Sequence, residues 1–301
     1  MTHPVDRHGN FTRFLMGLSL SIIGLSSASI NADTLEDLQG ALTFHASFDS
    51  GINADFAKGD KRLFTCLRAN NQSEARPGLN AEDKTLLVET GGLSGGALKF
   101  TQRNSKWIYF SGADNVSFTQ KNWSGTLSVW LRLDPEEDLA PGYTDPIQLT
   151  PRKWNDAAFF VDFDKAGDPR DFRLGAFPDL AVWNAENKNV NDIPEDKRPL
   201  VKVSSPPFGS DKWTHVVFTW KRFNTGKKNG IARFYLDGKL AGTLKGWEQT
   251  YSWQPDEEVR LFLGLNYIGL LDEVSAFDRA LSRSEVKHLF KLGEQIKKVI
   301  P

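Results

Sequence analysis

The stretch Arg233-Phe-Tyr-Leu-Asp-Gly-Lys-Leu240 is the part of the sequence that decides the fold class. It places Asp237 and Gly238 between two short runs in which apolar and polar residues alternate. Asp-Gly tolerates the positive φ that the central residues of a type I′ turn require, so the stretch predicts a tight β-hairpin. Alternation puts every second side chain on one face of a strand, and the hairpin therefore predicts antiparallel sheet.

Runs of the same texture occur on both sides of this hairpin, separated by Gly, Pro, Asn and Asp. Residues 213–220 read WTHVVFTW, and residues 125–133 place Leu127, Val129 and Leu131 on one face. Short strands at short spacing favour a sandwich of two sheets. We expect strands over residues 41–48, 97–101, 107–110, 125–133, 157–163, 172–177, 213–220, 231–236, 240–244, 259–263 and 267–277.

One helix is expected, at the C-terminal end of the chain. Ser282-Arg-Ser-Glu285 matches a capping box, in which the serine and the glutamate each bond a backbone N–H of the first turn. A partial apolar stripe follows, made of Val286, Leu289, Phe290 and Ile296. Because lysines fill the rest of the surface, we expect the helix to pack on the edge of the sandwich as a lid.

Charge and the N-terminal segment indicate the compartment. The 301 residues hold 37 Lys and Arg against 38 Asp and Glu, a net charge of −1. The chain therefore has no excess of positive charge that would attract nucleic acid. The apolar run 14–25 follows Arg7 and Arg13 and precedes small residues, which predicts a signal peptide over residues 1–32. The run is short for a membrane span, although an uncleaved anchor is the alternative. We therefore expect residues 33–301 to be a single secreted, periplasmic or cell-envelope domain with no membrane span.

Cys66 is the only cysteine of the chain. An internal disulfide and a cysteine-based zinc site are therefore impossible, so the fold must be held by its hydrophobic core, with a hard metal such as calcium as a possible addition. We expect Cys66 to be a small buried residue, with pairing to another molecule as the alternative.

The chain resembles the bacterial laminin G-like jelly-roll domains of the concanavalin A-like lectin and glucanase superfamily. In the C-terminal third, the resemblance is carried by residues 213–220, 232–239, 263–266 and 269–281. Nearer the N-terminus, residues 45–49 and the Gly-rich residues 92–100 resemble the first strand of the family and the entry into the next. The resemblance implies an all-β, two-sheet antiparallel jelly-roll sandwich. It implies no single activity, because this fold hosts lectins, glycosidases, lyases and adhesion modules.

The same resemblance implies a structural calcium ion at the edge where the N- and C-terminal strands meet. Its ligands would be Asp49, the backbone of Gly95 or Gly96, and Asp272. Calcium takes several oxygen ligands, so carbonyls can serve beside carboxylates. Asp272 also interrupts an apolar run, so its carboxylate either binds something or faces solvent.

Catalytic motifs are largely missing from the sequence. The Glu-x-Asp-x-x-Glu pattern of the laminarinase-type glycosidases that the fold resembles is absent, and so is a Gly-x-Ser-x-Gly nucleophile elbow. Asp162 and Asp164 alternate on one expected strand and would share a face. We predict a non-catalytic module; the alternative is a divergent glycoside hydrolase or lyase that uses Asp162, Asp164 or Asp171.

Residues 134–207 are longer and more polar than a minimal domain of this kind needs, and the family supplies no match here. Trp154 and Trp183 fall in loops of this stretch, where flat indole faces could stack on sugar rings. Polar partners for sugar hydroxyls would be Asp145, Arg152, Asp162, Arg170 and Arg173. Since loops on a rigid sandwich commonly carry specificity, we predict a site for a carbohydrate or an extracellular protein here. The alternatives are that the loop tryptophans pad the ends of the sandwich, or that the domain is a structural or adhesion spacer.

Overall fold

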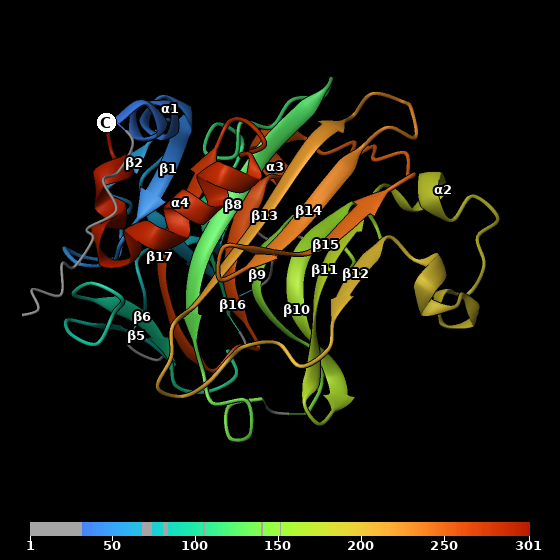
Figure 1. Cartoon of the computed structure of the whole chain (residues 1–301). Coiled ribbons are helices and arrows are strands. Elements are labelled where there is room, and N and C mark those ends of the chain that lie inside the picture. Colours follow the sequence, from blue (N-terminus) through green and yellow to red (C-terminus); the bar gives the residue numbers. More distant parts are fainter. Residues whose placement is uncertain (1–31, 68–73, 81–83, 105, 140, 151) are drawn as a thin grey trace, which may run out of the picture. The chain divides into compact units, whose positions relative to one another are not determined.

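A computed structural model describes residues 32–67, 74–80, 84–104, 106–139, 141–150 and 152–301. Residues 31–301 form one compact unit, in which two antiparallel sheets face each other across a hydrophobic core (Figure 1). The prediction of a two-sheet antiparallel sandwich is confirmed. Residues 1–31, which hold all but the last residue of the predicted signal peptide, lie outside the described residues.

The first sheet has nine strands in the described part of the chain. Their order is β15-β14-β13-β8-β17-β1-β2, with β6 also pairing with β17 and β5 with β6. The bounds are β1 Leu42–Ala46, β2 Phe56–Ala57, β5 Thr85–Val88, β6 Ala97–Phe100, β8 Trp123–Arg132, β13 Thr214–Phe223, β14 Ile231–Leu236, β15 Lys239–Lys245 and β17 Gly269–Phe277. The pairing of β1 with β17 brings the first and last described strands side by side, as the family resemblance implied.

The second sheet, counted over the same residues, has eight strands in the order β12-β11-β10-β9-β16-β7-β3-β4. The bounds are β3 Leu63–Cys66, β4 Arg76–Pro77, β7 Trp107–Ser111, β9 Thr144–Leu149, β10 Ala158–Gly167, β11 Arg170–Phe177, β12 Leu200–Val203 and β16 Arg260–Leu265. The polar stretch 134–207 supplies β9 to β12, which make up one half of this sheet. It is therefore an integral part of the sandwich.

The predicted hairpin joins β14 and β15. Asp237 and Gly238 have φ values of 48° and 71°, so both central residues of the turn adopt the left-handed backbone of a type I′ turn. Leu236 pairs directly with Lys239 across the turn. This prediction is confirmed.

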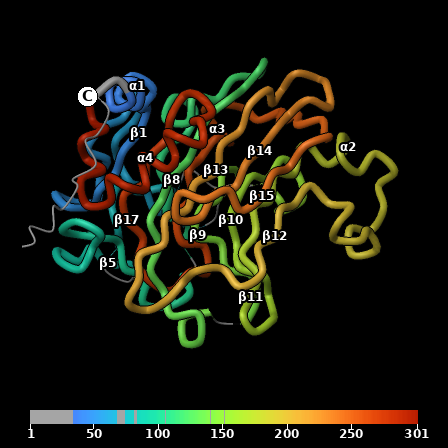
Figure 2. The backbone as a smooth tube through the Cα atoms, in the orientation of Figure 1, coloured from blue at the N-terminus to red at the C-terminus, as the bar shows by residue number. Residues whose placement is uncertain are grey.

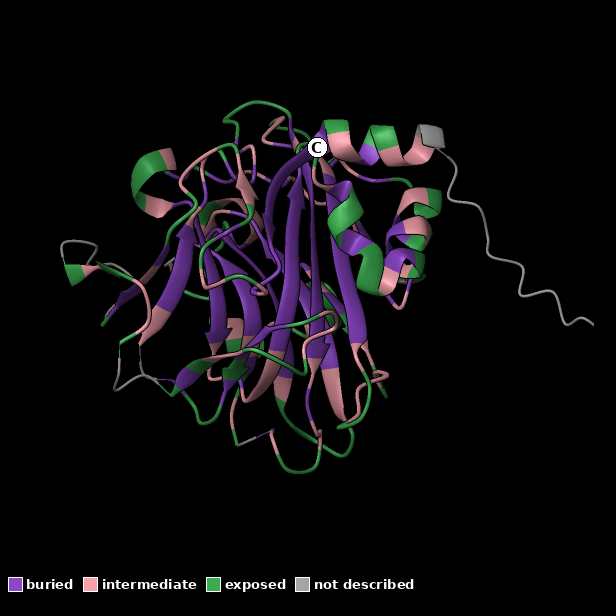
Figure 3. Cartoon of the chain, turned by 90° about the vertical axis from the view of Figure 1, so that its left-hand side faces the viewer, coloured by how far each residue is buried: buried purple, intermediate pink, exposed green. Residues whose placement is uncertain are grey.

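The core lies between the sheets and is rich in aromatic rings. Figure 3 shows buried residues along the strands and exposed residues in the loops. Trp123 is fully buried and meets Trp220 at 4.8 Å and Trp253 at 5.4 Å between ring centroids. Gly125 makes room for this cluster, because a Cβ at that position would lie 2.3 Å from the Trp220 ring. Edge-on packing of such rings adds about 0.5–1.5 kcal/mol per pair beyond the burial of area.

The predicted C-terminal helix is α4, Arg283–Leu292, and it begins at a complete capping box between Ser282 and Glu285. It covers the outer face of the first sheet, where Phe290 stacks on Trp130 of β8 at 5.7 Å (Figure 1). The sequence placed this helix at the edge of the sandwich. It contacts the edge strand β15, but it also extends over the face of the sheet as far as Trp130.

Other short helices were not expected from the sequence. They are α1 Ala32–Ala41, α2 Leu180–Trp183, η2 Val190–Asp192, η3 Glu195–Lys197 and α3 Pro255–Glu258. The predicted C-terminal helix included Ile296, but α4 ends before Gly293, whose φ is 48°, and Ile296 lies in the separate 3-10 helix η4, Gly293–Val299. Helix α1 lies against η4, and Gln39 Nε2 donates to the carbonyl of Lys298 at 2.8 Å. Figure 2 shows α2 and the segment after it beside β12, at the end of the second sheet. Within the part of the chain that the structure describes, no helix is both long and apolar enough to cross a membrane.

Cys66 is buried at the end of β3, beside Tyr109 and Phe262. The prediction that it is a small buried residue is confirmed.

Candidate ligand-binding site

A pocket of about 270 Å³ opens on the outer face of the second sheet. Strand alternation creates its lining: on β10, Val161 and Phe163 point into the core, whereas Phe160 and Asp162 line the pocket. The lining residues are Trp107, Tyr143, Asp145, Gln148, Arg152, Trp154, Phe160, Asp162, Arg173, Phe177, Arg198, Leu200 and Leu265. Five of the seven residues predicted to bind a ligand are among them: Asp145, Arg152, Trp154, Asp162 and Arg173.

Aromatic rings form one wall of the pocket. Phe160 and Phe177 stack at 6.0 Å with an angle of 7° between their planes, and Trp154 meets Phe177 edge-on at 5.5 Å. Gly175 on β11 allows this arrangement, because a Cβ there would lie 2.3 Å from the Phe160 ring. Trp154 keeps 49% of its surface exposed, so its indole is accessible to a ligand.

The polar floor of the pocket is a buried ion pair between β10 and β11. Arg173 Nε donates to Asp162 Oδ1 at 2.9 Å, and its Nη2 contacts Asp162 Oδ2. Arg173 Nη1 also lies 3.5 Å from Asp164 and 3.5 Å from Glu195, so Asp162 and Asp164 share a face as predicted. The guanidinium stacks over the Tyr143 ring at 4.9 Å. The floor is therefore fixed before any ligand arrives.

Burial raises the pKa of both carboxyl groups in the floor, Asp145 and Asp162. Burial raises the pKa of Asp162 to about 6, against the opposing effect of the Arg173 guanidinium. For Asp145, burial and the charge of Asp162 raise the pKa well above its usual value. Asp145 is thus favoured in its protonated form, which can donate a hydrogen bond into the pocket.

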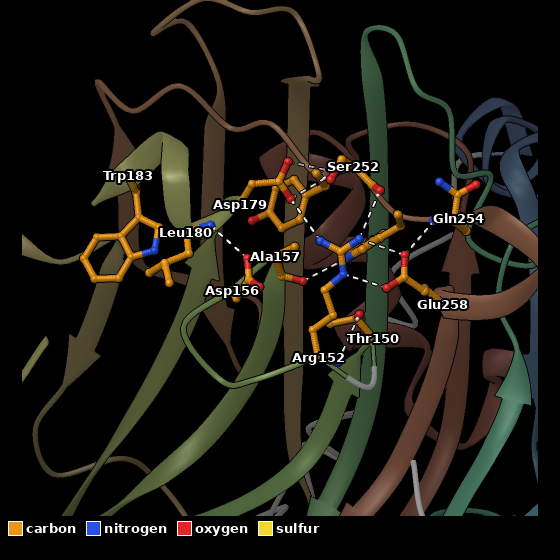
Figure 4. A network of polar contacts seen from close by, with 12 residues as sticks. Thr150, Arg152, Asp156, Ala157, Asp179, Leu180, Trp183, Ser252, Gln254 and Glu258 are labelled. Carbon is orange, nitrogen blue, oxygen red and sulfur yellow. Dashed lines mark hydrogen bonds and ion pairs between the residues drawn. The ribbon is translucent and has the colours of Figure 1, made fainter. Parts of the chain in front are cut away.

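Arg152 is held by the protein itself (Figure 4). Its Nε and Nη2 donate to the two carboxylate oxygens of Glu258 at 2.6 and 2.8 Å. Nη2 also donates to the carbonyl of Ser252 at 3.1 Å, and Nη1 to Asp179 at 3.4 Å. Arg152 therefore lines the pocket mainly by tying the loop of Trp154 to the segment before β16.

The structure places the other two predicted residues, Trp183 and Arg170, outside the pocket lining. Trp183 packs behind Phe177 at 5.2 Å and donates its indole N–H to the carbonyl of Asn155, and Figure 4 shows its ring away from Arg152. Arg170 donates to the backbone carbonyls of Leu139, Gly142 and Asp164. Both side chains support segments that carry lining residues.

The tryptophans at 247 and 253 pack against the core. Trp253 is fully buried and donates its indole N–H to the carbonyl of Ala157, and Trp247 is partly buried against the same core. Both rings therefore pad the sandwich rather than line the pocket.

Sequence reasoning missed eight lining residues: Trp107, Tyr143, Gln148, Phe160, Phe177, Arg198, Leu200 and Leu265. Strand alternation could have found Phe160 and Phe177, which share a face with Asp162 and Arg173. Trp107 and Arg198 gave no local signal, because the order of the strands brings them to the pocket.

The four predicted metal-site residues do lie together, at the edge formed by β1 and β17. Asp49 Oδ1 accepts a hydrogen bond from the N–H of Gly96 at 2.7 Å, and its other oxygen contacts the ammonium of Lys297 in η4. Asp272 is fully buried and accepts from the N–H of Leu93 at 2.7 Å. The Gly95 carbonyl accepts from the N–H of Gly92 at 2.9 Å. Asp272 thus binds the Gly-rich loop and does not face solvent.

This arrangement suits the Lys297 ammonium. Calcium usually takes six to eight oxygen ligands. Here the carboxylates of Asp49 and Asp272 already accept hydrogen bonds from backbone N–H groups, and Asp49 also contacts the Lys297 ammonium. Among the residues described, no group of three or more His, Cys, Asp or Glu side chains is placed to hold a metal ion. Calcium at this edge stays a prediction from the sequence.

The fold and this site can now be compared with known proteins. A family model described as the concanavalin A-like lectin/glucanases superfamily matches residues 103–287. The chain belongs to this superfamily. The concanavalin A-like assignment agrees with the sandwich and with the resemblance seen in the sequence, and it covers every strand from β8 to β17. A search of curated proteins finds no match.

Solved structures similar to this concanavalin A-like chain include carbohydrate-binding domains. Domain 4 of AbnA, an extracellular GH43 arabinanase from Geobacillus stearothermophilus in complex with arabinotriose, is 16% identical with a TM-score of 0.51. That match covers 83% of this chain and 98% of the domain. The binding domain of botulinum neurotoxin DC in complex with SialylT is 13% identical with a TM-score of 0.54, and the match covers 84% of this chain and 52% of that one. These likenesses show a shared fold.

Proposed function

We propose that this chain is a secreted or cell-envelope, non-catalytic module that binds a glycan in the pocket on the outer face of its second sheet. The observation that carries the proposal is the pocket itself, in which an accessible indole and stacked phenyl rings flank a fixed polar floor of Asp145, Asp162 and Arg173. Mostly apolar pockets with a few convergent polar groups are the usual form of small-molecule sites. The predicted signal peptide would deliver the module across the membrane.

Sugar recognition matches this chemistry. The C–H face of a pyranose can lie on the Trp154 indole, while its hydroxyls meet the acceptors and donors of the floor. A volume of about 270 Å³ lies near the lower end of small-molecule sites, which start at about 300 Å³. The pocket therefore suits one sugar unit or the end of a chain, with further units outside.

The similar solved structures support the choice of ligand class. One was determined with arabinotriose and another with SialylT, so the fold serves carbohydrate-binding domains in other proteins. Shared fold alone does not transfer a ligand, and the proposal for this chain rests on its own pocket.

Hydrolysis of the glycan is the alternative, and the floor argues against it. A glycosidase needs two carboxyl groups with separate roles, one as acid and one as nucleophile or base. Asp145 suits the acid role, but both oxygens of Asp162 are engaged by Arg173. Asp171 instead pairs with Lys202 at 3.3 Å. Among the described residues that line the pocket, no second carboxylate is left to attack a sugar or activate water.

A glycan array followed by calorimetric titration, each with and without EDTA, tests this proposal. Trp154→Ala should weaken binding of a glycan selected on the array by at least about tenfold, as aromatic anchors of binding sites commonly do. The matched control is Trp213→Ala, at a half-buried tryptophan just before β13 that stacks with Arg132. An array that retains no glycan, or equal losses in both variants, would contradict the proposal.

A further inference from the structure

Three arginines line the pocket, and two of them are neutralised by acidic side chains. Arg152 pairs with Glu258 and Asp179, and Arg173 pairs with Asp162 and Asp164. These two guanidinium groups are committed to the protein and offer little net charge to a ligand. The third arginine differs.

Arg198 stands just before β12, at the end of the segment that carries η3. Its Nε donates to the carbonyl of Ile193 at 2.9 Å, which fixes the direction of the side chain. Over the described residues, no carboxylate forms an ion pair with Arg198. The nearest acids along the chain are taken: Glu195 pairs with Arg173 and Lys202, and Asp196 with Lys197.

The terminal nitrogens of Arg198 are therefore available at the pocket. A guanidinium presents its N–H groups in a planar fork that matches a carboxylate with two parallel hydrogen bonds. Because the Nε bond already fixes this fork, less conformational entropy is lost when a ligand binds. Half-burial beside aromatic rings lowers the local dielectric and strengthens such a charge-assisted contact.

The acidic groups of the floor do not oppose an anion strongly. The Asp162 charge is matched by Arg173. Burial raises the pKa of Asp145, so its protonated form can donate a hydrogen bond to a ligand oxygen. Among the described residues that line it, the pocket thus offers the Arg198 guanidinium without an acidic partner and a carboxyl group, Asp145, whose raised pKa favours a donor.

We infer that the pocket selects a sugar that carries a carboxylate, such as a uronic acid. Arg198 binds the carboxylate, while the sugar ring stacks on the aromatic wall. This inference rests on the proposed glycan binding and adds the chemical class of the ligand. Arg198 would be the residue that sets specificity, and Trp154 the residue that supplies general affinity for sugar rings.

Calorimetric titration with matched pairs of oligosaccharides tests the inference. The pairs are trigalacturonate with its methyl ester, mannuronate trimer with mannotriose, and sialyllactose with lactose. For at least one pair, the wild type should bind the acidic member at least about tenfold more tightly than the neutral one. A tenfold difference in Kd corresponds to about 1.4 kcal/mol of binding free energy. Arg198→Gln should remove that preference while leaving the affinity for the neutral member and the melting temperature unchanged.

The control variant is Arg283→Gln, an exposed arginine at the start of α4 on the other sheet, which should behave as the wild type. If neutral members bind as tightly as acidic ones, or if Arg198→Gln leaves the preference intact, the inference is wrong while glycan binding stands. If neither member of any pair binds and a broad glycan array is also empty, the proposed function itself fails.

Discussion

The buried pair of Asp162 and Arg173 should respond very unequally to loss of one or the other partner. The two side chains are 3% and 8% exposed. Arg173→Met leaves the Asp162 carboxylate buried without its guanidinium, and breaking a buried pair in this way costs about 3–5 kcal/mol. Asp162→Asn leaves Arg173 beside Asp164 and Glu195, each 3.5 Å away, so its charge keeps partners. That variant should lose only a charge-assisted hydrogen bond, about 1.5–3 kcal/mol.

Acidification should rescue Arg173→Met in particular. The pKa of Asp162 is already raised to about 6 by burial, and removing the guanidinium that opposes this shift raises it further. When the pKa of a carboxyl group is higher in the folded protein than in the unfolded chain, the group costs no stability at pH values below its pKa in the unfolded chain. Stability then falls as pH rises from that value towards the pKa in the folded protein. The deficit of the variant should therefore shrink by up to about 1.4 kcal/mol per pH unit as pH falls from about 7.5 to about 6, because below the wild-type pKa of about 6 both proteins gain stability together.

Urea unfolding followed by tryptophan fluorescence at these two pH values measures both effects. The reasoning is refuted if Asp162→Asn is at least as destabilised as Arg173→Met at the higher pH, or if acidification leaves the deficit of Arg173→Met unchanged.

Three further outcomes are expected. Calcium should raise the melting temperature of Lys297→Met more than that of the wild type, because Asp49 then lacks its ammonium partner, and Asp272→Ala should abolish the shift. The absence of a calcium-dependent shift in all of these proteins would exclude calcium at this edge. Burial lowers the pKa of His215 to about 3, so below about pH 6.5 the unfolded chain binds a proton at this position that the folded protein does not bind. The free energy of unfolding of the wild type should therefore fall as pH drops from about 6.5 towards about 3. In urea unfolding, His215→Asn should show a flatter dependence of this free energy on pH, and an equal slope would disprove the buried neutral state. Trp183→Ala should lower stability by about 0.5–1.5 kcal/mol in urea unfolding, through lost contact with Phe177. It should weaken glycan binding less than Trp154→Ala does; a larger binding loss would place Trp183 in direct contact with the ligand.

Features set by local chemistry could be predicted from the sequence. The Asp237-Gly238 turn follows from the two backbone conformations that these residues tolerate, and the start of α4 follows from the capping box of Ser282. Helix α1 could not be predicted in this way. It is held by distant groups, including the carbonyl of Lys298 near the other end of the chain.

The pocket was found in part for the same reason. Asp162 and Arg173 are charged residues within strands, an unusual placement that draws attention in a sequence. Trp107 and Arg198 join them only because β7 and β12 belong to the same sheet, and pairing between strands that are far apart in sequence leaves no local pattern. Trp154 and Trp183 look alike in sequence, yet the hydrogen bond of Trp183 to Asn155 turns its ring away from the pocket lining.

Titration of the protein with the glycan selected on the array, followed by NMR of the indole N–H signals, tests the central claim most directly. The account predicts that the signals of Trp107 and Trp154 shift on binding, because both rings line the pocket. The signals of Trp213 and the core residue Trp253 should stay in place. Shifts confined to Trp213 or other residues of the first sheet would show that the ligand binds elsewhere and would contradict the account.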